Sequence, residues 1–121
     1  MVGGLESYRG DGRSPECVFC GRIVRGEFDR EYAFGVVRFA PVNPVVAGHM
    51  LFVPRAHAEH PDADAVGRSM AAAESYGGER KADFNLITSS GVDATQTVAH
   101  IHVHYVPRRS GDGLALPWTG Q

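Results

Sequence analysis

The sequence predicts an α+β fold, in which an antiparallel β-sheet of about five strands packs with one main helix. Strand-like stretches, in which apolar and β-branched residues recur at alternate positions, cover residues 31–40, 49–53, 83–89 and 97–108. One stretch, 61–75, has the alanines and the acidic start that are typical of a helix. The short connections between these stretches favour an antiparallel sheet.

The chain divides into a short arm and one domain. Residues 1–14 hold four glycines and no periodic pattern, so we expect a flexible N-terminal arm. Residues 15–121 are enough for a single hydrophobic core. Within them, residues 17–27 predict a short helical turn that ends near Gly26.

Prolines and glycines mark the connections. Pro41 and Pro44 predict a turn or an extended crossing after the first strand, because proline cannot donate a hydrogen bond inside a central strand. Pro54 and Pro107 end the second strand and the last strand in the same way. Residues 76–81, which include two consecutive glycines, are expected to form a loop after the helix.

The last strand carries three histidines on one face. Since successive side chains of a strand point to opposite sides, His100, His102 and His104 form a row, with apolar residues behind it. Half of the six histidines of the chain lie in this row. A solvated row without a function is one interpretation. The others are the uses of imidazole near neutral pH, namely nucleophilic attack, proton transfer and metal binding.

The composition excludes several classes of protein. The formal net charge of −2 gives no general affinity for nucleic acid or for an anionic membrane. No apolar run approaches the roughly 20 residues that a membrane-spanning helix needs, and the first residues do not resemble a secretory signal. We therefore expect a cytoplasmic protein.

Cys17 and Cys20 form a Cys-x-x-Cys pair with three interpretations. A thioredoxin-like redox site would follow a strand, and nothing before Cys17 is strand-like. The pair is otherwise two unrelated buried thiols, or half of a four-coordinate zinc site. His57 and His100 are candidates for the other two zinc ligands.

Four separated motifs resemble those of the histidine-triad family of nucleotide hydrolases and transferases. They are, in chain order, the cysteine pair 17–20, the segment Gly48–His57, the segment Gln96–Val98 and the triad His100–Val106, which reads His-Ile-His-Val-His-Tyr-Val. The resemblance extends from Cys17 to Trp118. The fold that it implies agrees with the predicted antiparallel α+β sheet.

The resemblance assigns roles to the histidine row. The second triad histidine, His102, is implied as the nucleophile that forms a covalent nucleotidyl intermediate, and it is also the one with an imidazole on each side. His104 is expected to donate to phosphate oxygens or to the bridging group, and as an imidazolium to lower the pKa of His102. In zinc-binding members the cysteine pair is completed by the positions of His57 and His100, so a structural zinc held by Cys17, Cys20, His57 and His100 is expected.

Further residues are implied by position. Ser89, Gln96 and Thr97 stand where relatives contact phosphates, with loop and strand capping as the alternative. His49 stands where a further histidine borders the site, or is a core histidine. Asn43 is the side chain nearest to the position at which relatives hold the ribose hydroxyls.

The implied activity is hydrolysis of a nucleoside 5′-phosphoramidate or of a (di)nucleoside polyphosphate, with a purine nucleotide as substrate and a homodimer as the assembly. His104 occupies the position of a glutamine in the hexose-phosphate uridylyltransferase branch, which favours hydrolysis over transfer. Two other functions stay open: a nucleotide-binding sensor or scaffold with little turnover, and a metal-dependent hydrolase that uses the histidine row. Trp118 is expected either to pack on its own sheet or to contact a partner subunit near the active site.

Overall fold

The computed structural model describes residues 16–118, so the predicted arm at 1–14 lies outside the described residues. The chain forms one five-stranded antiparallel sheet with the strand order β1-β2-β3-β5-β4. The strands are Arg30–Tyr32, Val36–Phe39, Met50–Pro54, Phe84–Ile87 and Val103–Pro107, numbered β1 to β5 along the chain. The helices are α2 (Val18–Val24) and α3 (Ala63–Arg80), with a short 3₁₀ turn at Val92–Ala94. The predicted fold class is confirmed.

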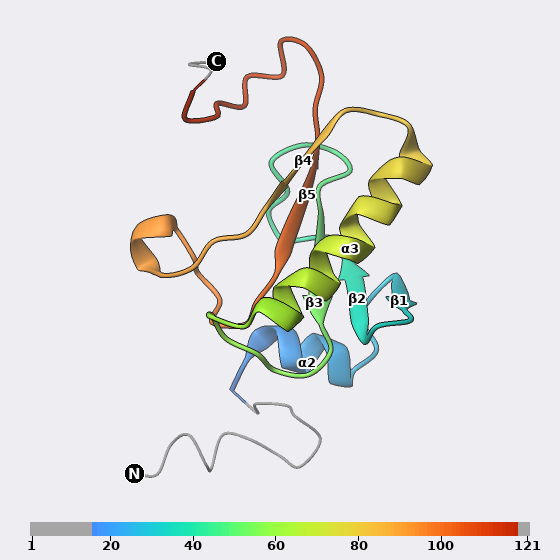
Figure 1. The fold of residues 1–121 in the computed structure, drawn as a ribbon, viewed down its shortest axis with the longest axis vertical. Helices are drawn as coiled ribbons and strands as arrows, with labels where there is room; N and C mark the ends of the chain where they lie inside the picture. Colours follow the sequence, from blue (N-terminus) through green and yellow to red (C-terminus); the bar gives the residue numbers. More distant parts are fainter. Residues whose placement is uncertain (1–15, 119–121) are drawn as a thin grey trace.

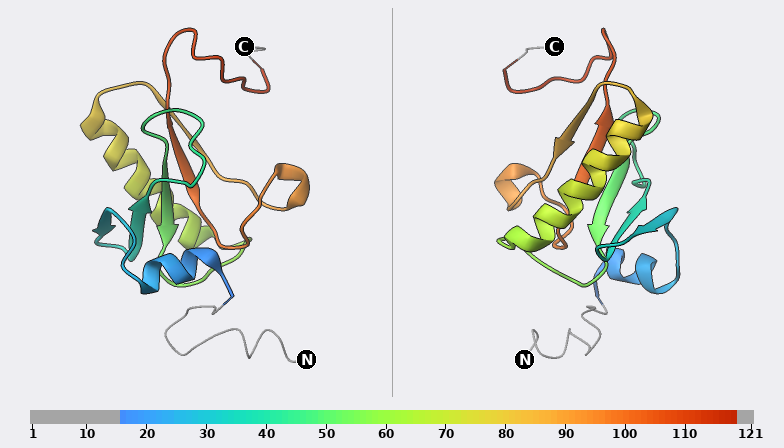
Figure 2. Two further views of the ribbon diagram at one scale, coloured as in Figure 1. Left: turned by 180° about the vertical axis from the view of Figure 1, so that it is seen from behind. Right: turned by 45° about the vertical axis from the view of Figure 1, so that its right-hand side comes forward.

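The two helices cover opposite faces of the sheet (Figures 1 and 2). Alternate side chains of each strand point to opposite faces, and this divides the apolar residues into two clusters. On one face, α3 packs through Ala72, Ala73 and Tyr76 on Val36, Phe52, Val103 and Tyr105. On the other, α2 packs through Phe19 and Ile23 on Val37, Phe39, Leu51 and Val53. Within residues 16–118, no helix is long and apolar enough to cross a membrane.

The main helix is longer than the sequence predicts. It begins as expected, with the Asp62 carboxylate accepting a hydrogen bond from the Ala65 N–H at 3.0 Å. It then continues through residues 76–80, which we expected to form a loop, and ends at Lys81 in the left-handed conformation. The prediction was wrong because Gly77 is a packing residue. A Cβ atom there would overlap the ring of Phe84 in β4, so this glycine lets the helix approach the sheet.

The stretch 31–40 is two strands and not one. The chain turns between them at Gly35, which has a φ of 69°. The Gly35 N–H donates a hydrogen bond to the Tyr32 carbonyl at 3.3 Å. Arg30 then pairs with Arg38 and Tyr32 with Val36. A glycine between two apolar runs is a hairpin signal, and this split brings the sheet to five strands.

The strand that carries the triad is also shorter than predicted. Regular pairing begins only at Val103. Before it, the Ile101 N–H donates to the Ala58 carbonyl at 2.8 Å, and the Thr88 hydroxyl donates to the His102 carbonyl at 2.8 Å. His100 and His102 are therefore held by loops that cross the end of the sheet.

Candidate active site and metal centre

The three histidines of the triad lie on the face of the sheet that α2 covers, as the alternation predicts. His104 pairs with Leu51 of the α2 cluster, and the rings of His102 and His104 are 5.1 Å apart between centroids. Phe19 of α2 contacts the rings of both His100 and His102, at 5.9 and 5.1 Å. The row thus runs from α2 to the start of β5.

His102 is held in one tautomer by the backbone. Its Nδ1 atom lies 2.7 Å from the His100 carbonyl oxygen, which can only accept a hydrogen bond. Nδ1 therefore carries the proton, and Nε2 keeps the lone pair that a nucleophile needs. His102 is buried, with 6% of its surface exposed.

His49 and His104 form a second chain of hydrogen bonds with a defined direction. The Val45 N–H donates to Nδ1 of His49 at 3.1 Å, so the neutral His49 ring carries its proton on Nε2. That Nε2–H faces Nδ1 of His104 at 2.9 Å, which must accept. The proton of His104 is consequently on Nε2, where it is a hydrogen-bond donor.

Burial keeps this row neutral. Desolvation lowers the pKa of His104 to about 4, and the neighbouring rings of His102 and His49 add to the effect. Desolvation also lowers the pKa of His102 and of His49. The expectation that His104 is an imidazolium that lowers the pKa of His102 was wrong for the free protein, because burial lowers the pKa of His104 to about 4 and its ring is neutral near pH 7.

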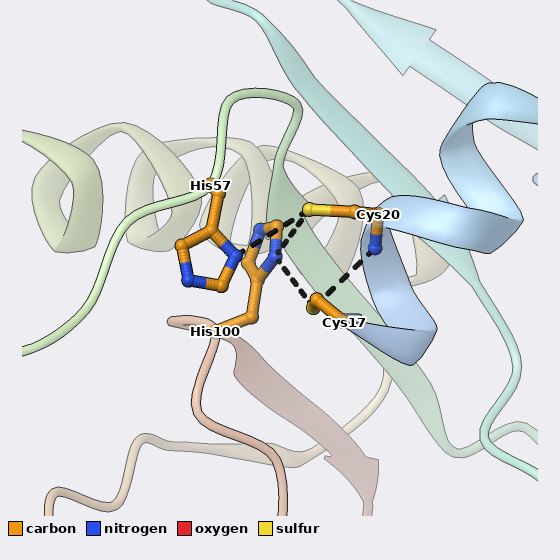
Figure 3. A group of neighbouring side chains, drawn as sticks. All are labelled: Cys17, Cys20, His57 and His100. Carbon is orange, nitrogen blue, oxygen red and sulfur yellow. Dashed lines mark hydrogen bonds between the residues drawn. The ribbon is translucent and has the colours of Figure 1, made fainter. Parts of the chain in front are cut away.

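Cys17 and Cys20 at the start of α2 come together with His57 after β3 and His100 before β5 (Figure 3), and their ligand atoms all lie within 4.8 Å of one another. Nδ1 of His100 is 3.4 Å from the Cys17 sulfur and 3.6 Å from that of Cys20. Nδ1 of His57 is 3.4 Å from the Cys20 sulfur. The four predicted metal residues therefore form one group, and neither cysteine is part of a disulfide.

The donor set and the tautomers fit zinc. Two thiolates and two imidazoles are the composition of many tetrahedral zinc sites. Nε2 of His100 donates to the Pro54 carbonyl at 2.8 Å, and Nε2 of His57 lies 2.8 Å from the Glu59 carboxylate. Each ring therefore presents the lone pair of Nδ1 to the two sulfur atoms, which is the arrangement that orients histidine ligands of zinc.

A cavity of about 340 Å³ adjoins the other end of the row. His49, His104 and Ser89 line it together with residues of β4, β5 and the segment that follows β5. The predicted Ser89 therefore lines the same cavity as His104. His102 does not line the cavity itself, and its ring reaches it only through the neighbouring ring of His104.

The other predicted nucleotide-binding residues lie further out. The side-chain amide of Gln96 forms hydrogen bonds within its own loop. It accepts one from the Gly91 N–H at 2.8 Å and donates one to the Val98 carbonyl at 3.0 Å. Thr97 and Asn43 are exposed. The structure therefore brings together His49, His104 and Ser89, and leaves Asn43 in the loop before β3.

Sequence reasoning missed two parts of the cavity wall. Thr95 lines it in the left-handed conformation, with a φ of 67°, and no local pattern indicates this. The segment 113–116 forms another wall. Trp118 does not pack on the sheet within the described chain, because 78% of its surface is exposed.

Comparisons with known proteins agree with these features. The sequence model of the HIT domain matches residues 32–111. The chain is 32% identical to an uncharacterized HIT-like protein of Methanocaldococcus jannaschii over 107 residues, which cover 80% of this chain and 82% of the relative. It is 28% identical to an adenosine 5′-monophosphoramidase of Saccharomyces cerevisiae over 117 residues, or 87% of this chain and 71% of the relative. The solved structure of a zinc-bound histidine triad family protein from Mycobacterium smegmatis has a TM-score of 0.65 and 30% identity, and the match covers 84% of this chain and 81% of that one.

Proposed function

The chain belongs to the HIT domain family, and on that premise we propose that it is a nucleotide hydrolase with His102 as its nucleophile. The substrate is a nucleoside 5′-phosphoramidate or a (di)nucleoside polyphosphate that is cleaved at the α-phosphate. One observation carries the proposal: the His100 carbonyl fixes the proton of His102 on Nδ1 and leaves Nε2 as a neutral nucleophile. The yeast relative, which is named as a monophosphoramidase, supports the substrate class.

In the first step, Nε2 of His102 forms a bond to the α-phosphorus while the bond from phosphorus to the leaving nitrogen or oxygen breaks. The electron pair of that bond goes to the leaving atom. For an amine, a water molecule supplies the proton that the nitrogen then takes up. The Nε2–H of His104, whose position the His49 hydrogen bond sets, donates to a phosphate oxygen and stabilises the charge that develops there.

In the second step, the hydroxide left from that water attacks phosphorus and the bond to Nε2 of His102 breaks; where the leaving group is a phosphate, the attacking group is a water molecule that loses a proton to solvent. The electron pair returns to the ring, and the nucleoside monophosphate is released. One water molecule is consumed in total. Its proton ends on the amine and its oxygen on the phosphate.

Other residues bind the nucleotide. The Ser89 hydroxyl beside His104 donates to the phosphate, and Thr97 adds a hydroxyl from the neighbouring loop. Gln96 acts through the loop that it braces, because both ends of its amide are already used. Asn43 contacts the ribose hydroxyls of a purine nucleotide.

Zinc at Cys17, Cys20, His57 and His100 has a structural role. When bound, it supplies a cross-link between α2 and the start of the triad segment. The solved zinc-bound histidine triad protein, 30% identical to this chain, supports the identity of the metal. Two cysteines outside any disulfide fit a protein of the reducing cytoplasm. The exposed Trp118 fits a homodimer in which it contacts the partner.

The test is direct trapping of the intermediate. The protein is mixed with adenosine 5′-phosphoramidate labelled at the α-phosphate and is quenched at alkaline pH. We expect label on His102 and release of adenosine monophosphate, both of which disappear in His102→Ala. Tight binding of the nucleotide with neither turnover nor label would instead indicate a binding protein.

A chelator separates the proposed mechanism from a metal-dependent hydrolase. Because the described metal group contains His100 but neither His102 nor His104, removal of zinc should lower the melting temperature before it lowers the rate. An immediate loss of activity at a temperature where the protein stays folded would favour metal-dependent chemistry.

A further inference from the structure

We propose that Arg30, Arg38 and Arg80 form a second anion-binding site, which takes a phosphate group. These three residues are called the arginine cluster below. The cluster lies on the face of the sheet that α3 covers, whereas the histidine row lies on the face that α2 covers. The site therefore does not depend on the chemistry proposed for His102.

The register of the sheet brings the first two arginines together. Arg30 of β1 pairs directly with Arg38 of β2, and residues that lie directly opposite in an antiparallel pair have their side chains on the same face. This is the face of α3, because Arg38 also pairs with Phe52 of β3, on which α3 packs. Two like charges placed directly opposite each other destabilise a sheet unless another group compensates them.

Two tyrosine rings hold the three guanidinium groups. The Cζ atoms of Arg38 and Arg80 lie 4.7 and 5.5 Å from the ring centroid of Tyr76, so one ring of α3 serves both arginines. Cζ of Arg30 lies 4.9 Å from the ring centroid of Tyr32, and Nη1 of Arg38 donates to the Tyr32 hydroxyl at 3.2 Å. A guanidinium that stacks on a ring keeps the N–H groups at its edge for another acceptor.

Carboxylates compensate little of the charge of the arginine cluster. Arg38 is the one member that forms an ion pair within residues 16–118, and its Nε atom lies 3.9 Å from Oδ2 of Asp29, which is too long for a hydrogen bond. That Nε atom is buried and has no hydrogen-bond partner in the described chain. The cluster therefore holds three positive charges against one distant negative charge.

A phosphate group matches these unused donors. The planar fork of a guanidinium fits the spacing of phosphate oxygens, and bonds between the two are stronger than those between neutral groups. An anion among the three side chains would also relieve the repulsion between Arg30 and Arg38. Since the formal net charge of the chain is −2, the attraction belongs to the arginine cluster and not to the protein as a whole.

The experiment titrates the full chain with inorganic phosphate and with pyrophosphate and follows the backbone amides by NMR. Sodium chloride at the same ionic strength controls for screening. We expect pyrophosphate to shift the amides of residues 29–38 and 76–81 in a saturable way. Binding of the same anion at the histidine row would shift residues 100–104 instead, so the two sites are measured separately in one titration.

Variants test whether the arginines hold the anion. Arg38→Gln and Arg80→Gln should each weaken pyrophosphate binding at the amides of 29–38 and 76–81 by about tenfold, as expected for the loss of a hydrogen bond to a charged group, without changing the shifts at 100–104. Arg25→Gln removes the same charge from an exposed arginine at the end of α2 that pairs with Glu27. It is the matched control and should keep the affinity of the wild type.

Melting temperatures show whether each variant is folded. Arg80 is exposed, so its variant decides the test if Arg38→Gln is destabilised. Saturable shifts that occur only at residues 100–104 would refute the second site. So would shifts that sodium chloride reproduces, or equal pyrophosphate affinities of the wild type and of the folded cluster variants.

Discussion

Two adjacent glycines in α3 should respond to alanine in opposite ways. Gly78 has nothing within 4 Å of the place that a Cβ would take, so Gly78→Ala gains the helix propensity of alanine, about 1 kcal/mol. At Gly77 the new Cβ would overlap the Phe84 ring, which is held at 5.2 Å between centroids from the ring of Tyr105. Overpacking of this kind costs about 1–3 kcal/mol, which cancels or exceeds the propensity gain.

The pair is its own control, since both changes add one methyl group to the same helix. In a domain of this size, 1 kcal/mol corresponds to about 4–8 °C in Tm. We expect Gly78→Ala to melt several degrees above the wild type and Gly77→Ala at or below it, as measured by thermal denaturation followed by circular dichroism. If both variants gained stability equally, the close approach of α3 to β4 would be wrong.

Three further predictions concern the site. His102→Ala should lower kcat by at least about a thousandfold without lowering Tm by more than a few degrees; a residual rate near that of the wild type would assign the nucleophile elsewhere. Glu59→Gln should weaken zinc binding by about tenfold in competition with a chelator, because the carboxylate orients His57. Glu74→Gln, on the exposed side of α3, is the control and should leave the zinc affinity unchanged. Equal zinc affinities of the two variants would show that Glu59 does not support the metal site. Burial lowers the pKa of His104 from 6.5 to about 4. Between these two pH values His104 binds a proton in the unfolded chain but not in the folded chain. The free energy of unfolding therefore falls as the pH is lowered through this range. Urea midpoints at about pH 7 and about pH 5 should show this fall, and His104→Gln should reduce it; an unchanged pH dependence in the variant would place its source in other groups.

The parts of the fold that sequence could predict are those set by local patterns. Alternation in the triad segment predicts a row of three histidines on one face because the period of a strand is independent of what packs on it. The helix start at Asp62 is equally local, since one side chain caps one N–H. The Cys-x-x-Cys spacing is a local signal for half of a zinc site, but the resemblance to a known family was needed to choose His57 and His100 as its partners, since Cys17 and His100 lie 83 positions apart.

The parts that failed depend on contacts between distant elements. Gly77 and Gly78 look like a loop until the ring of Phe84 explains why the first of them is needed inside a helix. The protonation state of His104 follows from burial and from His49, 55 positions away. The cavity wall at 113–116 follows a turn in which Arg108 donates to Asp112 and to the Leu114 carbonyl, and no pattern of apolar residues indicates such a turn.

His100 has two roles, one through its ring and one through its backbone carbonyl. Its ring belongs to the sulfur-containing group, and its backbone oxygen sets the tautomer of His102. The anchoring of the N-terminal helix and the readiness of the nucleophile are therefore joined in a single amino acid. A substitution at residue 100 can therefore replace or remove the metal ligand without changing the tautomer of His102 only if the backbone oxygen of residue 100 keeps its position.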